Sequence, residues 1–190
     1  MNDDNKNIQY LNFMVNNIHG EKKAYKAYKR GEKHDDAISL EELEVIAILE
    51  EMGFSLDYIG TYFYKELIMA ILNQLKGVPV RFEVLSEEEL TEQLNNPFSQ
   101  FYFDIARNDL DIGIKTFHAA ISKAIEEIYN DKNSSLCKEI FGDNGEFTEY
   151  GLNALDIAKY YFNSKGYKRK NNKLSRVKNS NGKVVTVDFS

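Results

Sequence analysis

The apolar residues of this chain recur mainly at the spacing of an α-helix. A first helix is predicted over 5–18, with the apolar run ending at Gly20, because four apolar residues lie three or four positions apart: Ile8, Leu11, Val15 and Ile18. The polar segment 21–33 either extends this helix or links it to the core. Further helices are predicted over 39–52, 61–76, 86–94, 134–141 and 148–164, with two more inside 98–130. This pattern indicates a mainly α-helical fold.

Polar residues mark the ends of two of these helices. Ser39 precedes Glu42 by three positions, which is the spacing of a capping box, and Gly53 is expected just beyond the end of the same helix. Ser86 opens a short acidic helix. We expect the glutamates at 87–89 to be solvated in its first turn, where the helix dipole favours negative charge, and not to bind a metal ion.

Two segments alternate between apolar and polar residues, as β-strands do. A strand is predicted over 78–85, where every second residue is apolar: Val78, Val80, Phe82 and Val84. A hairpin is predicted where Asn181-Gly182 separates two β-rich runs. A lone hairpin is marginally stable in water, so we expect it to pair with the 78–85 strand. The predicted fold class is therefore mainly α, with a small appended β-sheet or hairpin.

Residues 98–130 are predicted to form two helices joined by a turn at Gly113, the arrangement of a helix-turn-helix. The apolar spacing predicts which side chains face the core. They are Ile105 and Ala106 in the first helix, Leu110 and Ile112 in the turn, and Phe117, Ile121, Ala124, Ile125 and Ile128 in the second helix.

Two stretches of the chain carry a family resemblance. The first, EEMGFSLDYIGTYFYKELI at 50–68, has two glycines followed by aromatic residues and a basic–acidic pair. The second, FYFDIARNDLDIGIKTFHAAISKAIEEIY at 101–129, contains the predicted helix-turn-helix. In this order they resemble the C-terminal DNA-binding effector domain of the stage-zero sporulation master response regulator of endospore-forming bacteria. The resemblance covers roughly 38–166, and a segment around 80–96 is inserted relative to that family.

The resemblance implies an all-α helix-turn-helix domain that binds double-stranded DNA as a tandem homodimer. A role as a transcriptional or mobile-element regulator is expected on this basis. Residues 1–37 are predicted to be an N-terminal helix and basic linker, too short for the receiver domain that precedes the effector domain in that family. Control by phosphorylation of such a receiver is therefore not expected. Residues 38–166 form the predicted domain, and 167–190 a basic β-hairpin tail.

Charge is unevenly distributed along the chain. The net charge is −6, but residues 167–190 hold seven basic residues and one acidic residue, so this tail carries +6 and the remainder −12. A basic tail on an acidic body suggests an anionic partner for the tail, and a solvated, disordered tail is the alternative. Residues 104–129, in contrast, hold three basic and five acidic residues.

The second helix of the predicted helix-turn-helix offers few positive charges to DNA. Its outward residues are expected to be Lys115, Thr116, His118, Ala119, Ser122 and Lys123. No arginine lies in this helix, so a bidentate contact to guanine, worth roughly 1–3 kcal/mol of discrimination, is not available. Thr116 and Ser122 can still hydrogen-bond bases, and Ala119 can touch a thymine methyl group.

We therefore expect the tail to supply phosphate contacts, as a wing beside this helix. Its candidate DNA-binding residues are Lys168, Arg169, Lys170, Lys173, Arg176 and Lys178. A second contact to the DNA backbone can come from a basic cluster near the N-terminus: Lys22, Lys23, Lys26, Lys29, Arg30 and Lys33. The alternative is a protein-interaction module that keeps the helical packing without binding DNA, with the tail serving another anionic partner.

Catalytic and metal-dependent functions are not expected. The three histidines, His19, His34 and His118, lack the spacing of zinc ligands, and no phosphate-binding glycine loop occurs, so we predict no enzyme activity, metal or cofactor. The single cysteine, Cys137, cannot form an internal disulfide. The chain also lacks a signal-peptide pattern and an apolar run long enough to span a membrane, which predicts a cytoplasmic location.

Overall fold

The computed structural model describes residues 3–33, 38–79, 83–129, 134–142, 145–170 and 173–176. For 3–15, 109, 129, 168–170 and 173–176 the description covers the backbone path alone. The described elements are the α-helices α1 (Asp3–Lys29), α2 (Leu40–Glu51), α3 (Ile59–Leu75), α4 (Glu87–Asn95), α5 (Gln100–Asp104), α6 (Ile114–Tyr129), α7 (Ser135–Phe141) and α8 (Tyr150–Ser164), the π-helical turn η1 (Ile105–Asp109), and the strands β1 (Tyr167–Lys170) and β2 (Lys173–Arg176). The described part is mainly α-helical, as the sequence predicts.

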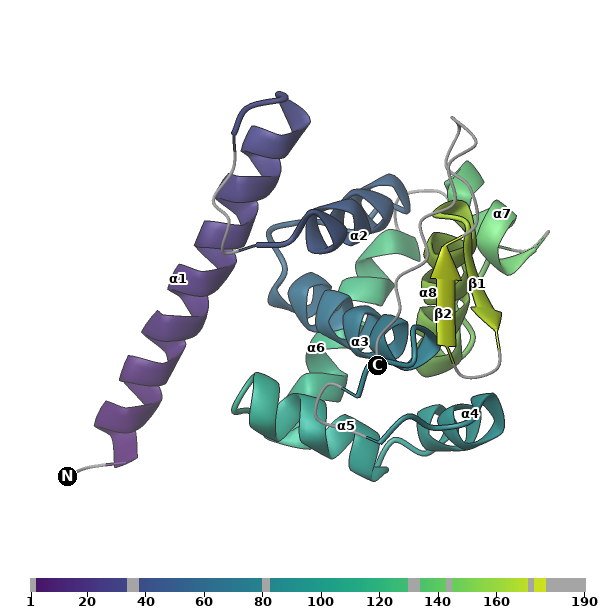
Figure 1. Ribbon diagram of the computed structural model, residues 1–190. Helices are drawn as coiled ribbons and strands as arrows, with labels where there is room; N and C mark the ends of the chain where they lie inside the picture. The colour runs from purple at the N-terminus through teal and green to yellow at the C-terminus, as the bar shows by residue number, and fades with distance from the viewer. Residues whose placement is uncertain are drawn as a thin grey trace.

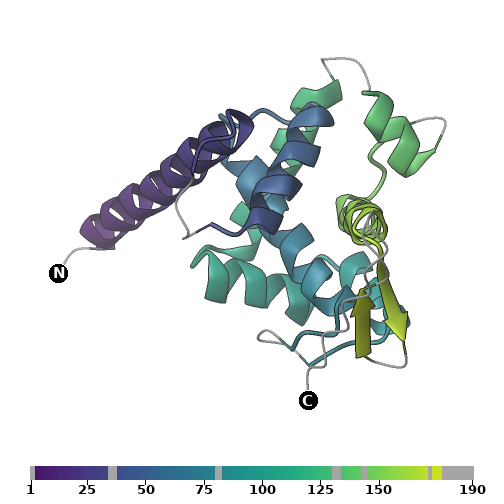
Figure 2. The same ribbon diagram turned by 45° about the horizontal axis from the view of Figure 1, so that its top comes forward.

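Helix α3 lies at the centre of the fold, with α2, α6 and α8 packed against it (Figures 1 and 2). Apolar residues occur on almost every side of α3, as expected for a helix surrounded by others. Leu67, Ile68 and Ile71 are all inaccessible to solvent. Helix α4 packs against α5 and α8 at one end of this arrangement. The apolar core therefore follows α3 along most of its length.

Serine residues cap several of the helices. Ser39 and Glu42 form the predicted capping box, in which each side chain accepts a hydrogen bond from the other residue's backbone N–H. Ser86 and Glu89 form a second capping box at the start of α4. Gly53 follows the C-cap of α2 with a φ of 102°, a left-handed conformation that glycine adopts easily. The prediction of these helix ends from the sequence is confirmed.

Helix α1 continues through Gly20 to Lys29, so the helix does not stop at Gly20 and the segment after it extends the helix, which is one of the two possibilities left by the sequence. A glycine inside a helix costs about 1 kcal/mol relative to alanine. The alanines, lysines and glutamate that follow are good helix formers and offset this cost. Gly31, with a φ of 67°, lies two residues after the end of the helix at Lys29. Figures 1 and 2 both show the N-terminal part of α1 projecting away from the other helices.

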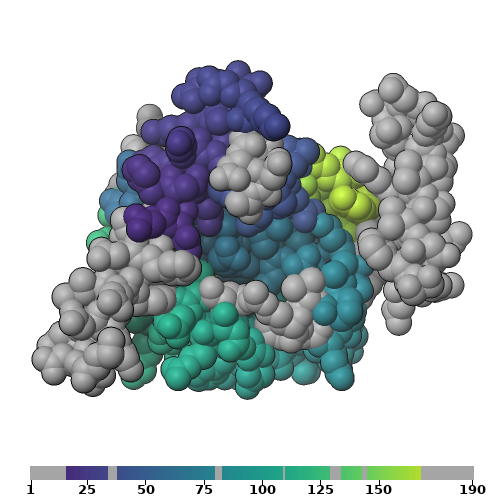
Figure 3. Space-filling view, turned by 60° about the vertical axis from the view of Figure 1, so that its left-hand side comes forward, coloured from purple at the N-terminus to yellow at the C-terminus, as the bar shows by residue number. Residues whose placement is uncertain are grey.

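The C-terminal part of α1 is attached to the other helices largely by charged groups, and it lies at the surface in Figure 3. Lys65 of α3 has a side chain that is 1% exposed, and its ammonium group binds three carboxylates. It lies 2.9 Å from Glu21 of α1, 3.3 Å from Glu42 of α2 and 2.7 Å from Glu66 beside it. Burial lowers the pKa of Lys65, but the carboxylates outweigh burial and raise that pKa well above its usual range. A charged, buried lysine therefore connects α1, α2 and α3.

The predicted strand over 78–85 does not form in the described residues of that segment, 78–79 and 83–85. The side chain of Gln74 in α3 bonds to the backbone there. Its Nε2 donates to the carbonyl of Glu83 at 3.3 Å, and its Oε1 accepts from the N–H of Leu85 at 2.8 Å. Because these backbone groups are bonded to α3, they are not available to a neighbouring strand.

Strands β1 and β2 follow α8 and pair antiparallel, with Tyr167 opposite Arg176 and Lys170 opposite Lys173. Among the described residues the sheet has these two strands, so the expected pairing with 78–85 is not formed there. The hairpin predicted around Asn181-Gly182 lies outside the described residues.

Candidate nucleic-acid interface

The segment predicted as a helix-turn-helix folds as two helical pieces around a turn. Helix α5 continues directly into η1, where the N–H of Leu110 donates to the carbonyl of Ile105 at 3.2 Å and closes a π-helical turn. Residues 110–113 then lead into α6. Gly113 lies in this turn as predicted, but the left-handed residue is Asp111, with a φ of 48°. Aspartate is one of the few side chains that adopt this conformation at low cost.

Close packing against α3 fixes the position of α6. A Cβ atom on Gly60 of α3 would lie 1.9 Å from the carbonyl oxygen of Ala120, so only glycine allows the two helices to approach this closely. The buried ring of Phe117 stacks on Phe63 with centroids 6.0 Å apart. The prediction of the inner face is confirmed, since every residue in it is buried or partly buried: Ile105, Ala106, Leu110, Ile112, Phe117, Ile121, Ala124, Ile125 and Ile128.

The outer face of α6 carries polar and small residues that are open to solvent. Five of the six residues predicted to face outward are exposed: Lys115, Thr116, Ala119, Ser122 and Lys123. Within the described part of the chain, the polar side chains among them form no hydrogen bond or ion pair. Ala119 lies between them and adds little bulk. This face is therefore available to another molecule.

Positive and negative charges are separated along this outer face. Lys115 lies in its first turn and Lys123 lies past its middle. Glu126 and Glu127 are exposed three and four positions after Lys123, and Asp111 is exposed in the turn before α6. The acidic residues therefore lie at the two ends of this face, and the stretch 115–123 carries none.

His118, the sixth predicted residue, is bonded within the protein. Its Nε2 donates to the carbonyl of Pro97 at 2.5 Å, and its Nδ1 accepts a hydrogen bond from the hydroxyl of Tyr150. The ring also lies against Tyr102, with centroids 5.1 Å apart. Burial lowers the pKa of His118, and the bond to Pro97 offsets this only in part. The neutral imidazole thus connects α6 to α8 and to the loop before α5.

One exposed cation near this face was not singled out from the sequence. Arg107 lies in η1, is exposed, and forms no ion pair with another described residue. Within the predicted helix-turn-helix, the helical spacing pointed to the second helix as the DNA-contacting element, and Arg107 precedes the turn. In the sequence, the polar residues that follow it, Asn108 and Asp109, indicate that this part of the first helix faces solvent.

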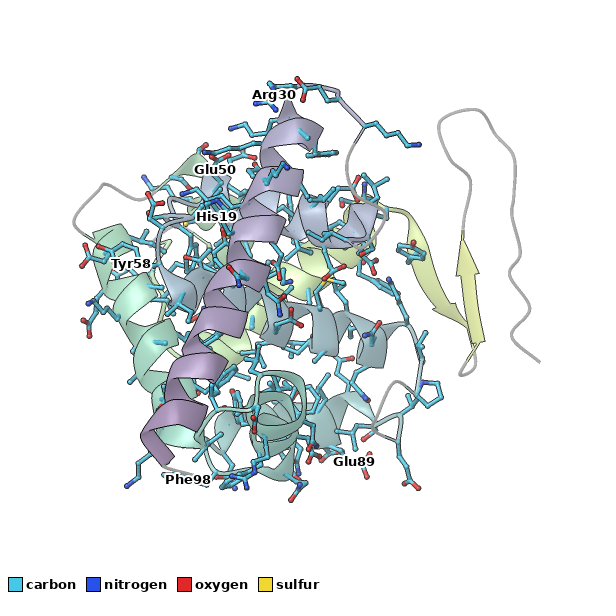
Figure 4. The ribbon with its side chains drawn as sticks, turned by 90° about the vertical axis from the view of Figure 1, so that its left-hand side faces the viewer. His19, Arg30, Glu50, Tyr58, Glu89 and Phe98 are labelled. Carbon is cyan, nitrogen blue, oxygen red and sulfur yellow. The ribbon has the colours of Figure 1, made fainter. Side chains whose placement is uncertain are left out.

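The basic residues of the tail lie away from α6 as far as the structure describes them. Those on β1 and β2 are Lys168, Arg169, Lys170, Lys173 and Arg176, and Lys178 lies outside the described residues. In Figure 4 the two strands and α6 lie on opposite sides of the helical body. The ring of Tyr167 contacts Phe162 of α8, with centroids 5.4 Å apart. The described part of the tail is therefore not the wing beside α6 that was expected.

Other kinds of site are not found among the described residues. Among them, no group of histidine, cysteine, aspartate and glutamate side chains is arranged to hold a metal ion. None of the helices in this part of the chain combines the length and the apolar character needed to cross a membrane. Cys137 is buried, and its thiol lies 3.6 Å from the carbonyl oxygen of Met52.

Comparison of the chain with protein-family models, curated proteins and solved structures gives no match. A function is therefore inferred from the residues of the chain and their arrangement.

Proposed function

We propose that this chain binds double-stranded DNA through the outer face of α6. One observation carries the proposal: a helix fixed by α3 exposes a row of residues that bind no other described group, namely Lys115, Thr116, Ala119, Ser122 and Lys123. The major groove of B-DNA is wide enough for an α-helix. Lysine side chains bind phosphates, hydroxyl groups bind base edges, and alanine can contact the methyl group of thymine.

The sequence preference of such an interface is expected to be modest. Helix α6 contains no arginine, so it lacks the bidentate guanine contact that is worth roughly 1–3 kcal/mol. His118 would have to give up its bonds to Pro97 and Tyr150 before it could contact a base. Additional affinity must therefore come from other cations. We propose that the basic tail contacts phosphates at a separate place on the duplex and not as a wing beside α6, since its described strands lie on the opposite side of the helical body. The residues concerned are Lys168, Arg169, Lys170, Lys173, Arg176 and Lys178.

The resemblance of residues 38–166 to the sporulation regulator's effector domain supports the same function. On this basis we propose a cytoplasmic transcriptional or mobile-element regulator that binds DNA as a homodimer. The helix-turn-helix role of the segment from α5 to α6 is part of this proposal.

A salt titration of DNA binding tests the role of α6. Binding of the full chain to a fluorescently labelled, mixed-sequence duplex is measured by anisotropy over a range of salt concentrations. Each phosphate contact contributes about 0.9 to the slope of log affinity against log salt. The double variant Lys115→Gln/Lys123→Gln is therefore expected to lower the slope by up to about 1.8. Lys138→Gln, which removes an exposed lysine from α7, is the matched control and should leave the slope unchanged.

Two further variants separate base contacts from phosphate contacts. Ser122→Ala should change the preference between duplex sequences more than the salt slope, because phosphate contacts carry no direct sequence information. Replacing Lys168, Arg169, Lys170 and Lys173 by alanine should lower the slope if the tail contacts phosphates. If wild type binds no duplex even at low salt, the DNA-binding proposal is wrong. If the α6 variants behave as wild type while the tail variant loses affinity, the interface is the tail and not α6.

A protein-interaction module is the second candidate, and one observation favours it. Phe98 is 60% exposed and Phe103 is 41% exposed, and both belong to the segment that leads into η1 (Figure 4). Exposed aromatic side chains are common where proteins contact each other. This alternative predicts that wild type binds no duplex and that Phe98→Ser/Phe103→Ser abolishes binding to a protein partner.

A further inference from the structure

The second half of α1 presents one side to the other helices and the opposite side to solvent. Residues spaced by three or four positions lie on the same side of a helix. Three residues of α1 at this spacing, together with Arg30 directly after its end, form a stripe along the outer side, which we call the α1 stripe: His19, Lys23, Lys26 and Arg30. All four are exposed, and Figure 4 labels His19 and Arg30. Basic side chains therefore line the solvent side of α1 from its middle to its end.

The basic residues on the inner side of α1 are neutralised by acidic partners. Lys22 pairs with Asp57 in the loop before α3. Lys29 donates to Glu50 of α2 at 2.8 Å, and the hydroxyl of Tyr25 donates to the same carboxylate at 2.7 Å. These lysines attach α1 to the other helices and are not available to a partner molecule.

The α1 stripe has few acidic neighbours. Within the described residues, Lys23 and Lys26 form no ion pair or hydrogen bond, although Lys26 lies near enough to the exposed Asp57 to help lower the pKa of that carboxyl group. Arg30 binds Glu32 through two bonds of 2.7 and 2.8 Å at the exposed end of the helix. The only acidic residue between positions 19 and 30 is Glu21, which binds the buried Lys65. The positive charge of this half of α1 is therefore concentrated on its solvent side.

The attachment of α1 holds the stripe in a defined place. Glu21 is anchored by Lys65, and Ala24 and Tyr25 are buried in a small apolar cluster with α2. At 1.5 Å of rise per residue the stripe is about 16 Å long, which is enough to follow several phosphates along one strand of a duplex. A cation on a fixed helix loses less conformational freedom on binding than one on a mobile chain.

We propose that the α1 stripe is a second contact to the phosphate backbone of duplex DNA, separate from α6. The inference rests on the proposed function and extends the interface beyond the segment that resembles the sporulation regulator. In Figure 4 α1 faces the viewer, with α6 on one side of it and β1 and β2 on the other.

The test uses the full chain and the same labelled duplex. Lys23→Gln/Lys26→Gln removes the two stripe lysines that lack acidic partners. It should lower the slope of log affinity against log salt by up to about 1.8, since two phosphate contacts are lost. The preference between duplex sequences should stay as in wild type. Lys23→Arg/Lys26→Arg keeps both charges and should restore the slope, and Lys138→Gln should again behave as wild type. Unchanged thermal melting of each variant shows that α1 remains attached.

Several outcomes would overturn the inference, and they are distinguishable from failure of the proposed function. If wild type binds no duplex, both proposals fall. If Lys115→Gln/Lys123→Gln lowers the slope and Lys23→Gln/Lys26→Gln does not, α6 binds DNA and the α1 stripe does not. A change in sequence preference without a change in slope would also contradict a phosphate contact by the stripe.

Discussion

Replacement of Lys65 by methionine is expected to be strongly destabilising. Methionine keeps an unbranched side chain but removes the ammonium group, which leaves the carboxylates of Glu21, Glu42 and Glu66 without their shared cation. Breaking a buried ion pair in this way costs about 3–5 kcal/mol. The three carboxylate side chains are 18%, 27% and 28% exposed, so water reaches them and reduces the cost. We therefore expect the free energy of unfolding to fall by about 3 kcal/mol at neutral pH.

Urea unfolding of the full chain, followed by circular dichroism, measures this loss. Lys22→Met is the matched control, because its partner Asp57 is 79% exposed and a surface ion pair is worth less than about 1 kcal/mol. The loss in Lys65→Met should shrink in acid. Without Lys65 the carboxyl groups have raised pKa values in the folded state, so the folded protein takes up protons first and regains stability as pH falls. Equal losses in the two variants would refute the charge-compensating role of Lys65.

A variant of Glu21 tests the same cluster, and its expected effect on stability is opposite in sign to that of Lys65→Met. Burial raises the pKa of Glu21 above its ordinary value of 4.5, and Lys65 offsets this only in part. The ionised carboxylate therefore opposes folding at neutral pH, and this penalty is relieved as pH falls through the raised pKa. Glu21→Gln should accordingly be as stable as wild type or slightly more stable at neutral pH, with the difference vanishing in acid. A marked loss at neutral pH would contradict this account of the cluster.

Three further predictions concern the support of α6 and the middle of α1. Because burial lowers the pKa of His118 below its ordinary value of 6.5, the unfolded chain takes up the proton first, so stability should decline as pH falls from about 6.5 and level off below the folded pKa. His118→Gln should weaken that decline in urea unfolding measured across this range, and an identical pH profile would argue against it. Gly60→Ala should cost at least about 1–3 kcal/mol, because its Cβ would lie 1.9 Å from the Ala120 carbonyl oxygen. A Cβ atom on Gly20 would have no neighbouring heavy atom within 4 Å. Gly20→Ala should therefore raise the melting temperature, because the free energy of unfolding rises by up to about 1 kcal/mol.

Local spacing in the sequence was sufficient to predict the capped starts of α2 and α4, the end of α2 and the inner face of α6, but not the end of α1. Capping by Ser39 and Glu42 depends on residues three positions apart, so the sequence contains all the information that the cap requires. The apolar stripe that includes Phe117 and Ile121 follows in the same way from the helical repeat. Lys115 and Lys123 lie on the opposite side of the helix from that stripe, so their exposure follows from the same repeat.

Three features that local spacing could not predict depend on contacts between residues that are distant in sequence. From the sequence alone, Lys65 is one more polar residue in α3. Its role depends on Glu21 and Glu42, which lie on two other helices. His118 belongs to the outward side of α6 by spacing alone, but Tyr150 of α8 binds it. Gln74 bonds to the backbone of a segment with the alternation of a strand and keeps it beside α3. In each case one side chain from another element changed the outcome.

The π-helical turn η1 determines how the fold would accommodate the loss of one residue between α5 and α6. A π turn closes its hydrogen bond one residue later than an α turn, so it accommodates an additional residue without moving the helices on either side. Asn108 is exposed in this turn, between the buried Ile105 and the start of α6. Deleting Asn108 would allow the turn to close as an ordinary α-helix while Ile105 and Phe117 keep their places in the core. Length at this point of the chain can therefore vary by a single residue while the presentation of α6 is preserved.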